Sequence, residues 1–303
     1  MKIIRLFLLI FITLSSFAMN WWGEPKEART KARQERVQKE FADIKKEKEQ
    51  EGFDDYTLLL NAARNGNIDR VEFLLSHGAN PNKNPSYEEA ASRYYRAENT
   101  PLIESAIRNA LDGDDRILYM LINAGADINA QGFNGNTALQ TLVAAEQFDY
   151  YPHIVHTITL LLNVGANPDI YDNNGQSPLI SAIVHRRYNI IQLLLSHGAN
   201  PNIFTLKTNS SALMVAVKRL PYHIQNYDEY LKIIHLLLQA GADPFLKTNR
   251  PYFSTDKLDS AFTLAQKELE SEDEPKRKAA LQSIIDMFND PTKVKKTGFQ
   301  KIP

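Results

Sequence analysis

Residues 174–202 read NGQSPLISAIVHRRYNIIQLLLSHGANPN and contain two short apolar runs between turn signals. Asn-Gly is a turn dipeptide, and Ser177 followed by Pro178 is typical of a helix start, with serine as the cap and proline in the first turn. Gly198 supplies the left-handed residue that closes a second helix, and Pro201 prevents its continuation. The stretch therefore predicts a unit of helix, turn, helix and extended loop.

Each of the two helices in this unit has an apolar face, and we expect the turn between them at residues 187–189. The apolar residues of the first helix are Leu179, Ala182, Ile183 and Val184, and those of the second are Ile190, Ile191, Leu193, Leu194 and Leu195. A pair of short helices cannot bury two apolar faces alone. Such a unit must stack on similar neighbours.

The phrase that closes this unit occurs five times in the chain, each time after an apolar run. Its copies are His77–Pro81, Ala124–Ile128, Val164–Pro168, His197–Pro201 and Ala240–Pro244. A recurring helix pair predicts an array in which each unit contacts only its neighbours. Arrays of this kind favour binding over catalysis as the function.

The unit resembles the ankyrin repeat, whose first helix opens with Thr-Pro-Leu-His-x-Ala over a period of about 33 residues. The matching openings start at Thr100, Thr137 and Ser177 and, more weakly, at Thr57 and Ser211. The signature histidine is absent from every copy and is replaced by Leu60, Ile103, Gln140, Ile180 and Met214. The resemblance implies an all-α ankyrin-repeat solenoid of about five repeats over residues 53–290. A C-terminal helical cap would be formed by residues 261–269 and 276–288.

Three repeats carry extra residues, which we expect between their two helices, and a further insertion lies between Asn82 and Asn99. Tyrosine is concentrated in these insertions, and its large, partly polar ring suits binding surfaces. The candidate partner-binding residues there are Tyr94, Tyr95, Tyr150, Tyr151, Tyr222 and Tyr227. The alternative is that these rings pack on neighbouring helices.

The loops that project from the array, called fingers below, offer a second candidate surface. Phe133, Tyr171 and Phe204 occupy equivalent or near-equivalent finger positions, which the resembled family fills with polar residues. A row of aromatic side chains would form a platform for a ligand. The alternative is that each ring covers the hairpin of its neighbour.

The N-terminus predicts export. Lys2 and Arg5 precede an apolar run, and small residues at Ser16 and Ala18 fit a cleavage site, so residues 1–18 read as a signal peptide. The alternative is an uncleaved anchor formed by residues 3–22. We expect a periplasmic or secreted protein of bacterial type, with no other contact with a membrane.

Two further segments flank the repeats. Residues 19–52 mix many acidic and basic side chains, which indicates a charged helical spacer or an N-terminal cap that docks through Phe41 and Ile44. Residues 291–303 read as a basic flexible tail.

The composition gives little support for chemistry. The chain has no cysteine, so thiol catalysis, disulfides and thiolate metal sites are excluded. Its net charge is −1, and −3 without residues 1–18, which argues against nucleic acid as a partner. His153 and His156 lie one turn apart, but the sequence places no third ligand near them. We therefore expect no metal, no cofactor and no enzymatic activity.

The sequence predicts a protein that binds another protein as a periplasmic scaffold or inhibitor. One alternative is a secreted bacterial effector that binds a host protein. A second alternative, in another class, is a small-ligand or metal-binding protein that uses the inserted loops.

Overall fold

The computed structural model describes residues 26–50, 52–82, 99–132, 134–145, 151–220, 227–247 and 260–290. The chain divides into two compact units, Met1–Asp54 and Asp55–Pro303. In the first unit the charged stretch is a helix, α2 (Lys26–Gln50), and Phe41 on this helix is 52% exposed.

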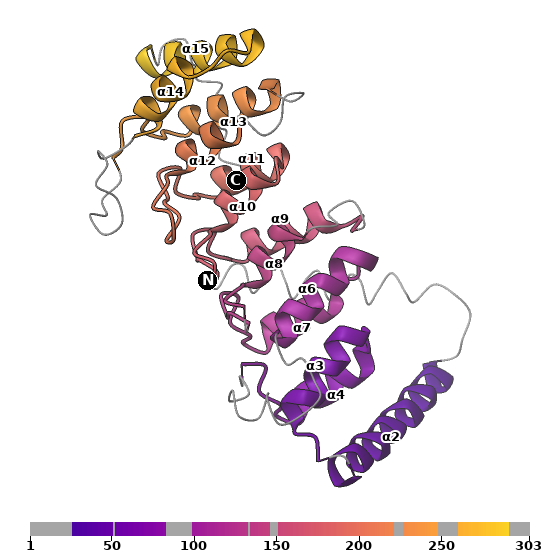
Figure 1. The fold of residues 1–303 in the computed structure, drawn as a ribbon. Coiled ribbons are helices and arrows are strands. Elements are labelled where there is room, and N and C mark those ends of the chain that lie inside the picture. The colour runs from indigo at the N-terminus through magenta and orange to yellow at the C-terminus, as the bar shows by residue number, and fades with distance from the viewer. Residues whose placement is uncertain are drawn as a thin grey trace. The chain divides into compact units, whose positions relative to one another are not determined.

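The second unit is a series of helix pairs, and the prediction of an all-α solenoid is confirmed (Figure 1). The described pairs are α3 (Asp55–Asn65) with α4 (Ile68–Ser76), α6 (Pro101–Asp112) with α7 (Arg116–Asn123), α8 (Ala138–Ala144) with α9 (Ile154–Asn163), α10 (Pro178–Val184) with α11 (Tyr188–Ser196), α12 (Ala212–Arg219) with α13 (Tyr227–Gln239), and α14 (Ala261–Glu270) with α15 (Pro275–Asn289).

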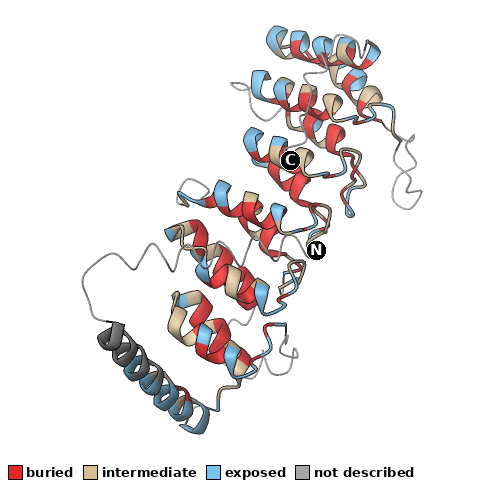
Figure 2. Cartoon of the chain, turned by 180° about the vertical axis from the view of Figure 1, so that it is seen from behind, coloured by how far each residue is buried: buried red, intermediate tan, exposed pale blue. Residues whose placement is uncertain are grey.

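The first helices of the pairs pack against one another in sequence order and form one layer, which we call the inner helices: α3, α6, α8, α10, α12 and α14. The second helices form the other layer, the outer helices. Buried residues lie where the layers and neighbouring pairs meet (Figure 2). Leu118, Leu139, Ile158, Leu179 and Leu194 are all fully buried there. Each pair therefore completes the core of the next.

The predicted helix starts are confirmed at the inner helices, where a serine or threonine with extended backbone precedes the first turn. Its side-chain oxygen accepts a hydrogen bond from the backbone amide three residues later, which satisfies one otherwise unpaired donor. The caps are Thr100, Thr137, Ser177, Ser211 and Ser260. The first pair differs: Thr57 lies inside α3, which begins at Asp55.

The closing glycines of the five repeats all have φ between 86° and 100°, as the left-handed closure requires: Gly78, Gly125, Gly165, Gly198 and Gly241. The alanine that follows each glycine donates its amide five residues back, as Ala199 does to the Leu194 carbonyl at 3.0 Å. This bonding satisfies carbonyls that the helix end would leave unpaired.

Two details differ from the sequence expectation. In the second pair the extra residues lengthen α6 to 12 residues, against seven in α10, rather than forming a loop. In the fourth pair the turn lies earlier than residues 187–189, because α11 already begins at Tyr188. Arg186 makes this tight turn with φ of 57°, a left-handed conformation that the equivalent Gly66 adopts without a Cβ.

A ladder of asparagine and aspartate side chains joins successive repeats at the base of the fingers. Asn202 accepts a hydrogen bond from the Asp243 amide at 2.7 Å and donates one to the Gly241 carbonyl at 3.3 Å. Asn82 makes the same two bonds to the following repeat. Single bonds from the amides of Asn167 and Asn200 to the preceding repeat complete the series. The loops are therefore in fixed register with the helices.

We expect Asn202→Ala to destabilise the protein by about 1–2 kcal/mol, because the Asp243 amide and the Gly241 carbonyl both lose a partner. Asn202→Asp keeps the acceptor and should cost less. Urea unfolding followed by circular dichroism measures both. Equal losses of stability in the two variants would show that the side-chain oxygen of residue 202, which accepts the Asp243 amide, is not the important group.

We expect Arg186→Gly to be more stable than Arg186→Ala by about 1 kcal/mol, because glycine removes the steric cost of the left-handed backbone. Arg186→Ala is the matched control, since it removes the same side chain but keeps a Cβ. Urea unfolding should place the glycine variant above the alanine variant. Identical stability of these two variants would contradict this explanation.

Candidate functional site

The structure describes four of the nine aromatic residues that the sequence singles out: Tyr151, Tyr171, Phe204 and Tyr227. The other five lie outside the described residues: Tyr94, Tyr95, Phe133, Tyr150 and Tyr222. All four described side chains are half-buried. Only Tyr171 and Phe204 are brought together, on neighbouring fingers, whereas Tyr151 lies in the turn before α9.

Burial, and then the negative charge of Asp169, raise the pKa of the Tyr171 phenol. The backbone of Phe204, on the next finger, interacts with the Tyr171 phenol and acts to lower its pKa. The Tyr171 carbonyl accepts a hydrogen bond from Gln131 on the preceding finger at 2.8 Å. Tyr171 is thus tied to the preceding finger, and part of its surface stays exposed.

Tyr227, the first residue of α13, donates its hydroxyl hydrogen to Glu274 Oε2 at 3.1 Å. Glu274 also caps α15, because its carboxylate accepts the amides of Lys276 and Arg277. The bond from the Arg277 amide is the main reason why the pKa of Glu274 lies below its ordinary value. Burial and the hydrogen bond to Glu274 raise the pKa of Tyr227. The bond from Tyr227 to Glu274 therefore fastens the last helix pair to the fifth repeat.

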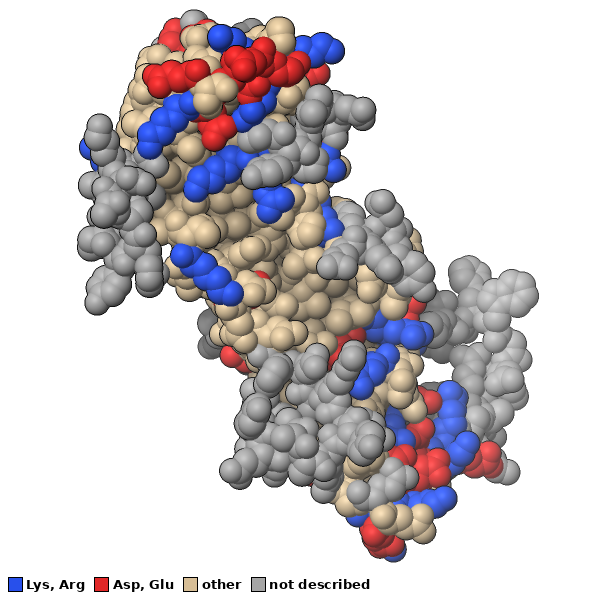
Figure 3. Space-filling view, viewed as in Figure 1, with Lys and Arg blue, Asp and Glu red and all other residues tan. Residues whose placement is uncertain are grey.

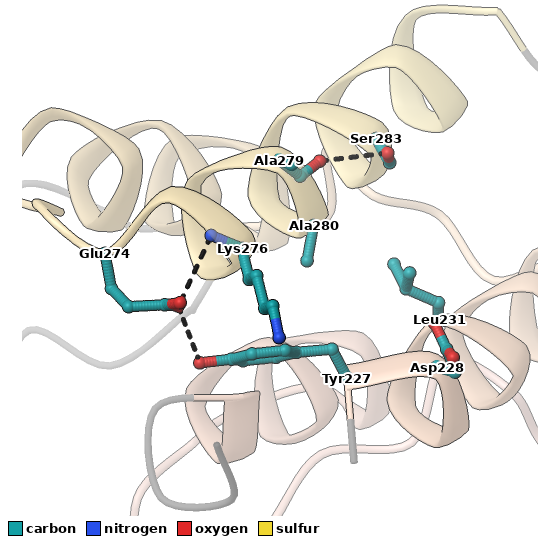
Figure 4. A pocket seen from close by; sticks show the side chains of 8 residues that line it. All are labelled: Tyr227, Asp228, Leu231, Glu274, Lys276, Ala279, Ala280 and Ser283. Carbon is teal, nitrogen blue, oxygen red and sulfur yellow. Dashed lines mark hydrogen bonds between the residues drawn. The ribbon is translucent and has the colours of Figure 1, made fainter. Parts of the chain in front are cut away.

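A cavity of about 700 Å³ lies beside this bond, between α13 and α15 (Figure 4). Its lining comprises Tyr227, Asp228, Leu231, Glu274, Lys276, Ala279, Ala280 and Ser283. Acidic, basic and apolar groups are mixed on its walls, so the lining favours no single chemical class of ligand.

Several of the described histidines make hydrogen bonds within the fold. His77 and His197 bond through Nδ1 to helix carbonyls, at 2.8 and 2.9 Å. His156 contacts the Asp115 carboxylate at 3.2 Å, a partner that sequence reasoning missed because 41 residues separate the two. Among the described residues no group of three or more histidine, aspartate or glutamate side chains is placed to hold a metal ion.

The inner helices α8, α10 and α12 leave only a few side chains partly exposed, at the seventh residue after the cap and, in α8 and α12, also at the fourth. In α8 these are Thr141 and Ala144, in α10 the seventh is Val184, and in α12 the fourth is Val215. These uncharged side chains form a strip across α8, α10 and α12, which we call the inner strip. Because the other uncharged residues of these helices are buried, the inner strip is the uncharged part of this layer that an external molecule can contact.

Charged residues bound the inner strip on both sides. Toward the N-terminus Arg64 forms an ion pair with Glu104 at 3.0 Å, and toward the C-terminus Lys218 follows Val215 by one turn of α12. Figure 3 shows a broad uncharged area in the middle of this unit with basic side chains around it. Sequence reasoning missed this strip, although the spacing from the helix caps contains the signal.

Comparisons with known proteins agree with this architecture. The sequence profile described as "Ankyrin repeats (3 copies)" matches residues 33–131, 106–205 and 156–248. A stretch of 123 residues, 40% of this chain, is 34% identical to 8% of protein glp-1 of Caenorhabditis elegans. A stretch of 130 residues, 43% of this chain, is 32% identical to 33% of an ankyrin repeat protein of fowlpox virus. The chain thus matches well under half the length of either relative.

The solved structures include an ankyrin repeat domain from Acinetobacter baumannii AYE. It aligns with a TM-score of 0.53 and 21% sequence identity, over 76% of this chain and 98% of that domain. This likeness concerns the fold alone. None of the helices described in the present structure is long and apolar enough to cross a membrane.

We expect Glu274→Gln to lower the thermal midpoint at neutral pH. The pKa of Glu274 is lowered in the folded protein. The ionised carboxylate therefore contributes to the free energy of unfolding above the ordinary carboxyl pKa of 4.5, and this contribution is lost as pH falls through the folded-state pKa. The difference between the wild type and the variant should therefore shrink in acid. Tyr227→Phe keeps the cap and should retain part of the pH dependence. A difference that does not vary with pH would contradict this assignment.

Proposed function

Because the chain belongs to the ankyrin-repeat family, we propose that it is an exported, non-enzymatic scaffold that binds another protein through the inner strip and the adjoining fingers. Ankyrin repeats are a protein–protein interaction module, and the array here extends over most of the chain. The family fixes the type of function, whereas the surface has to be argued from the side chains.

The observation that carries the proposal is the inner strip. Thr141, Ala144, Val184 and Val215 are uncharged and half-buried, and they follow one another across three adjacent inner helices. A small, uncharged centre bordered by charge is the composition that protein interfaces favour. The partly exposed Tyr171 ring lies on the finger that precedes α10 and can extend this contact area.

The inner strip differs from the outer faces of the same repeats in being continuous and uncharged. The outer faces of the same repeats carry exposed polar residues, such as Gln192 on α11, and isolated exposed apolar ones, such as Val155 at 45% exposure. Single apolar residues on a surface are ordinary. A continuous strip over three repeats is the feature that needs a partner.

Export rests on the N-terminal sequence. Lys2 and Arg5, the apolar run of residues 6–14 and the small residues Ser16 and Ala18 have the order of a signal peptide. Residues 1–25 lie outside the described residues. The proposal is therefore that the mature protein begins at Met19 and reaches the periplasm or the medium.

We expect the intact mass of the protein, purified from its native cells through a C-terminal tag, to correspond to residues 19–303. Fractionation of the cells then assigns the mature form to the periplasm or the medium. Recovery mainly in the medium would favour an effector that acts on another cell. A full-length mass in the cytoplasmic fraction would refute export.

The wild type is crosslinked to its partner protein in the native compartment. We expect a double variant, Ala144→Glu with Val184→Glu, no longer to crosslink to that partner, because two charges would enter the uncharged strip. The matched control is Val155→Glu with Gln192→Glu, which adds the same charge to the outer helices. Circular dichroism checks that both variants are folded. Retention of the partner by the inner variant, or its equal loss from the control, would refute the proposed surface.

A further inference from the structure

Acidic residues are missing from a long central segment of the chain. Between Asp172 and Asp228, residues 173–227 contain no aspartate or glutamate but five basic residues: Arg186, Arg187, Lys207, Lys218 and Arg219. The rest of the chain carries 30 basic and 36 acidic residues. The segment spans α10, α11, α12 and the finger between α11 and α12, so these neighbouring repeats carry basic residues without acidic ones.

Two of the five basic residues, both arginines, contact a neighbouring repeat. The Arg187 guanidinium donates to the carbonyls of Val143 and Ala145, which ties the fourth repeat to the third. Arg186 pairs with Glu229 on α13 at 3.5 Å. These two arginines are thus engaged in holding repeats together.

Lys218 and Lys207 are held in a different way, by neutral oxygen atoms. Lys218 folds back along α12 and donates to Ser210 Oγ at 3.0 Å, on the finger hairpin that Phe204 and Ser211 bridge. Lys207, on the same hairpin, donates to Asn174 Oδ1 on the preceding finger at 3.2 Å. Within the described residues neither ammonium has a carboxylate within ion-pair distance.

Lys218 also adjoins the inner strip. Val215 lies one turn before it on α12, and Val184 occupies on α10 the position that Lys218 occupies on α12. A molecule that crosses the strip from α8 toward α12 would therefore meet uncharged side chains first and the Lys218 ammonium next, with Lys207 on the hairpin that Lys218 contacts. An ammonium group keeps two donors after it has donated one hydrogen bond.

We propose that the strip and these two lysines bind an acidic segment of the partner protein, with apolar or small side chains on Val184 and Val215 and carboxylates on Lys218 and Lys207. Charge-assisted hydrogen bonds to carboxylates are the strong form of this interaction. The proposal rests on the proposed function, because it names the chemistry of the partner at the same surface.

The charge distribution favours a protein segment over a nucleic acid. Binding to a phosphate backbone requires an extended basic surface that neutralises many phosphates. Here two lysines lie beside an uncharged strip, and the rest of the chain has an excess of acidic residues that would repel a long polyanion. A short run of aspartate or glutamate would pair with the two lysines, and the apolar side chains next to it would contact the uncharged strip.

The test is a selection of random displayed peptides on the full mature protein. We expect the recovered peptides to be rich in aspartate and glutamate. Selection on a double variant, Lys207→Glu with Lys218→Glu, should lose this excess or recover basic peptides instead. The matched control is Lys232→Glu with Lys278→Glu, which changes two exposed lysines of the outer helices α13 and α15 and should still recover acidic peptides.

The individual contributions are measured with the peptide that binds the wild type most tightly. Lys218→Met and Lys207→Met, which keep the apolar stem, should each raise its Kd about fivefold, the upper range for a solvent-accessible ion pair. Added salt should raise the Kd of the wild type more than that of the methionine variants.

Recovered peptides without an acidic excess, or an excess that the Lys207→Glu with Lys218→Glu variant retains, would overturn the inference. Displacement of the peptides by a single-stranded oligonucleotide at comparable concentration would also overturn it in favour of a phosphate ligand. The crosslinking experiment in the native compartment distinguishes failure of this inference from failure of the proposed function. If the crosslink is lost with Ala144→Glu and Val184→Glu but survives the lysine reversal, the surface is correct and its partner is not acidic.

Discussion

The contact between one helix pair and the next is the interaction on which the rest of the second unit depends. A single pair exposes two apolar faces, and the chain has no cysteine with which to stabilise it covalently. Leu118, Leu139 and Leu194 become fully buried only because a neighbouring pair covers them. The asparagine ladder adds the register, since Asn82 and Asn202 satisfy backbone groups of the following repeat rather than their own. Stability in such an array is therefore a sum over neighbours.

The features that the sequence predicts well are those that arise from a few consecutive residues. A serine or threonine cap and a closing glycine act within one turn, so the helix starts at Thr100, Thr137 and Ser177 and the closure at Gly198 could be placed without a structure. The sequence predictions are wrong where the same residues can adopt two local conformations. The extra residues of the second repeat could form a loop or lengthen α6, and only packing against α3 and α8 decides between them.

The contacts of the candidate site are less predictable, because they join residues that are far apart in the chain. Tyr227 and Glu274 are 47 residues apart, and His156 and Asp115 are 41 apart. Tyrosine-rich composition draws attention to Tyr227 but does not indicate that its hydroxyl fastens the last helix pair. The inner strip was missed for a different reason: Ala144 and Val184 look like core residues, and only their position relative to the caps distinguishes them from the buried residues beside them.

The same constraint explains why charge can be segregated in this fold. Because the core forms between neighbouring helix pairs, the seventh residue after the caps of α8, α10 and α12 stays partly exposed and can differ from repeat to repeat. From α8 to α12 the seventh position changes from Ala144 through Val184 to Lys218, while each helix still begins at its serine or threonine cap. A change in partner chemistry therefore costs the solenoid little stability. Arg187 is the contrasting case, since its guanidinium holds two carbonyls of the preceding repeat and cannot be exchanged so freely.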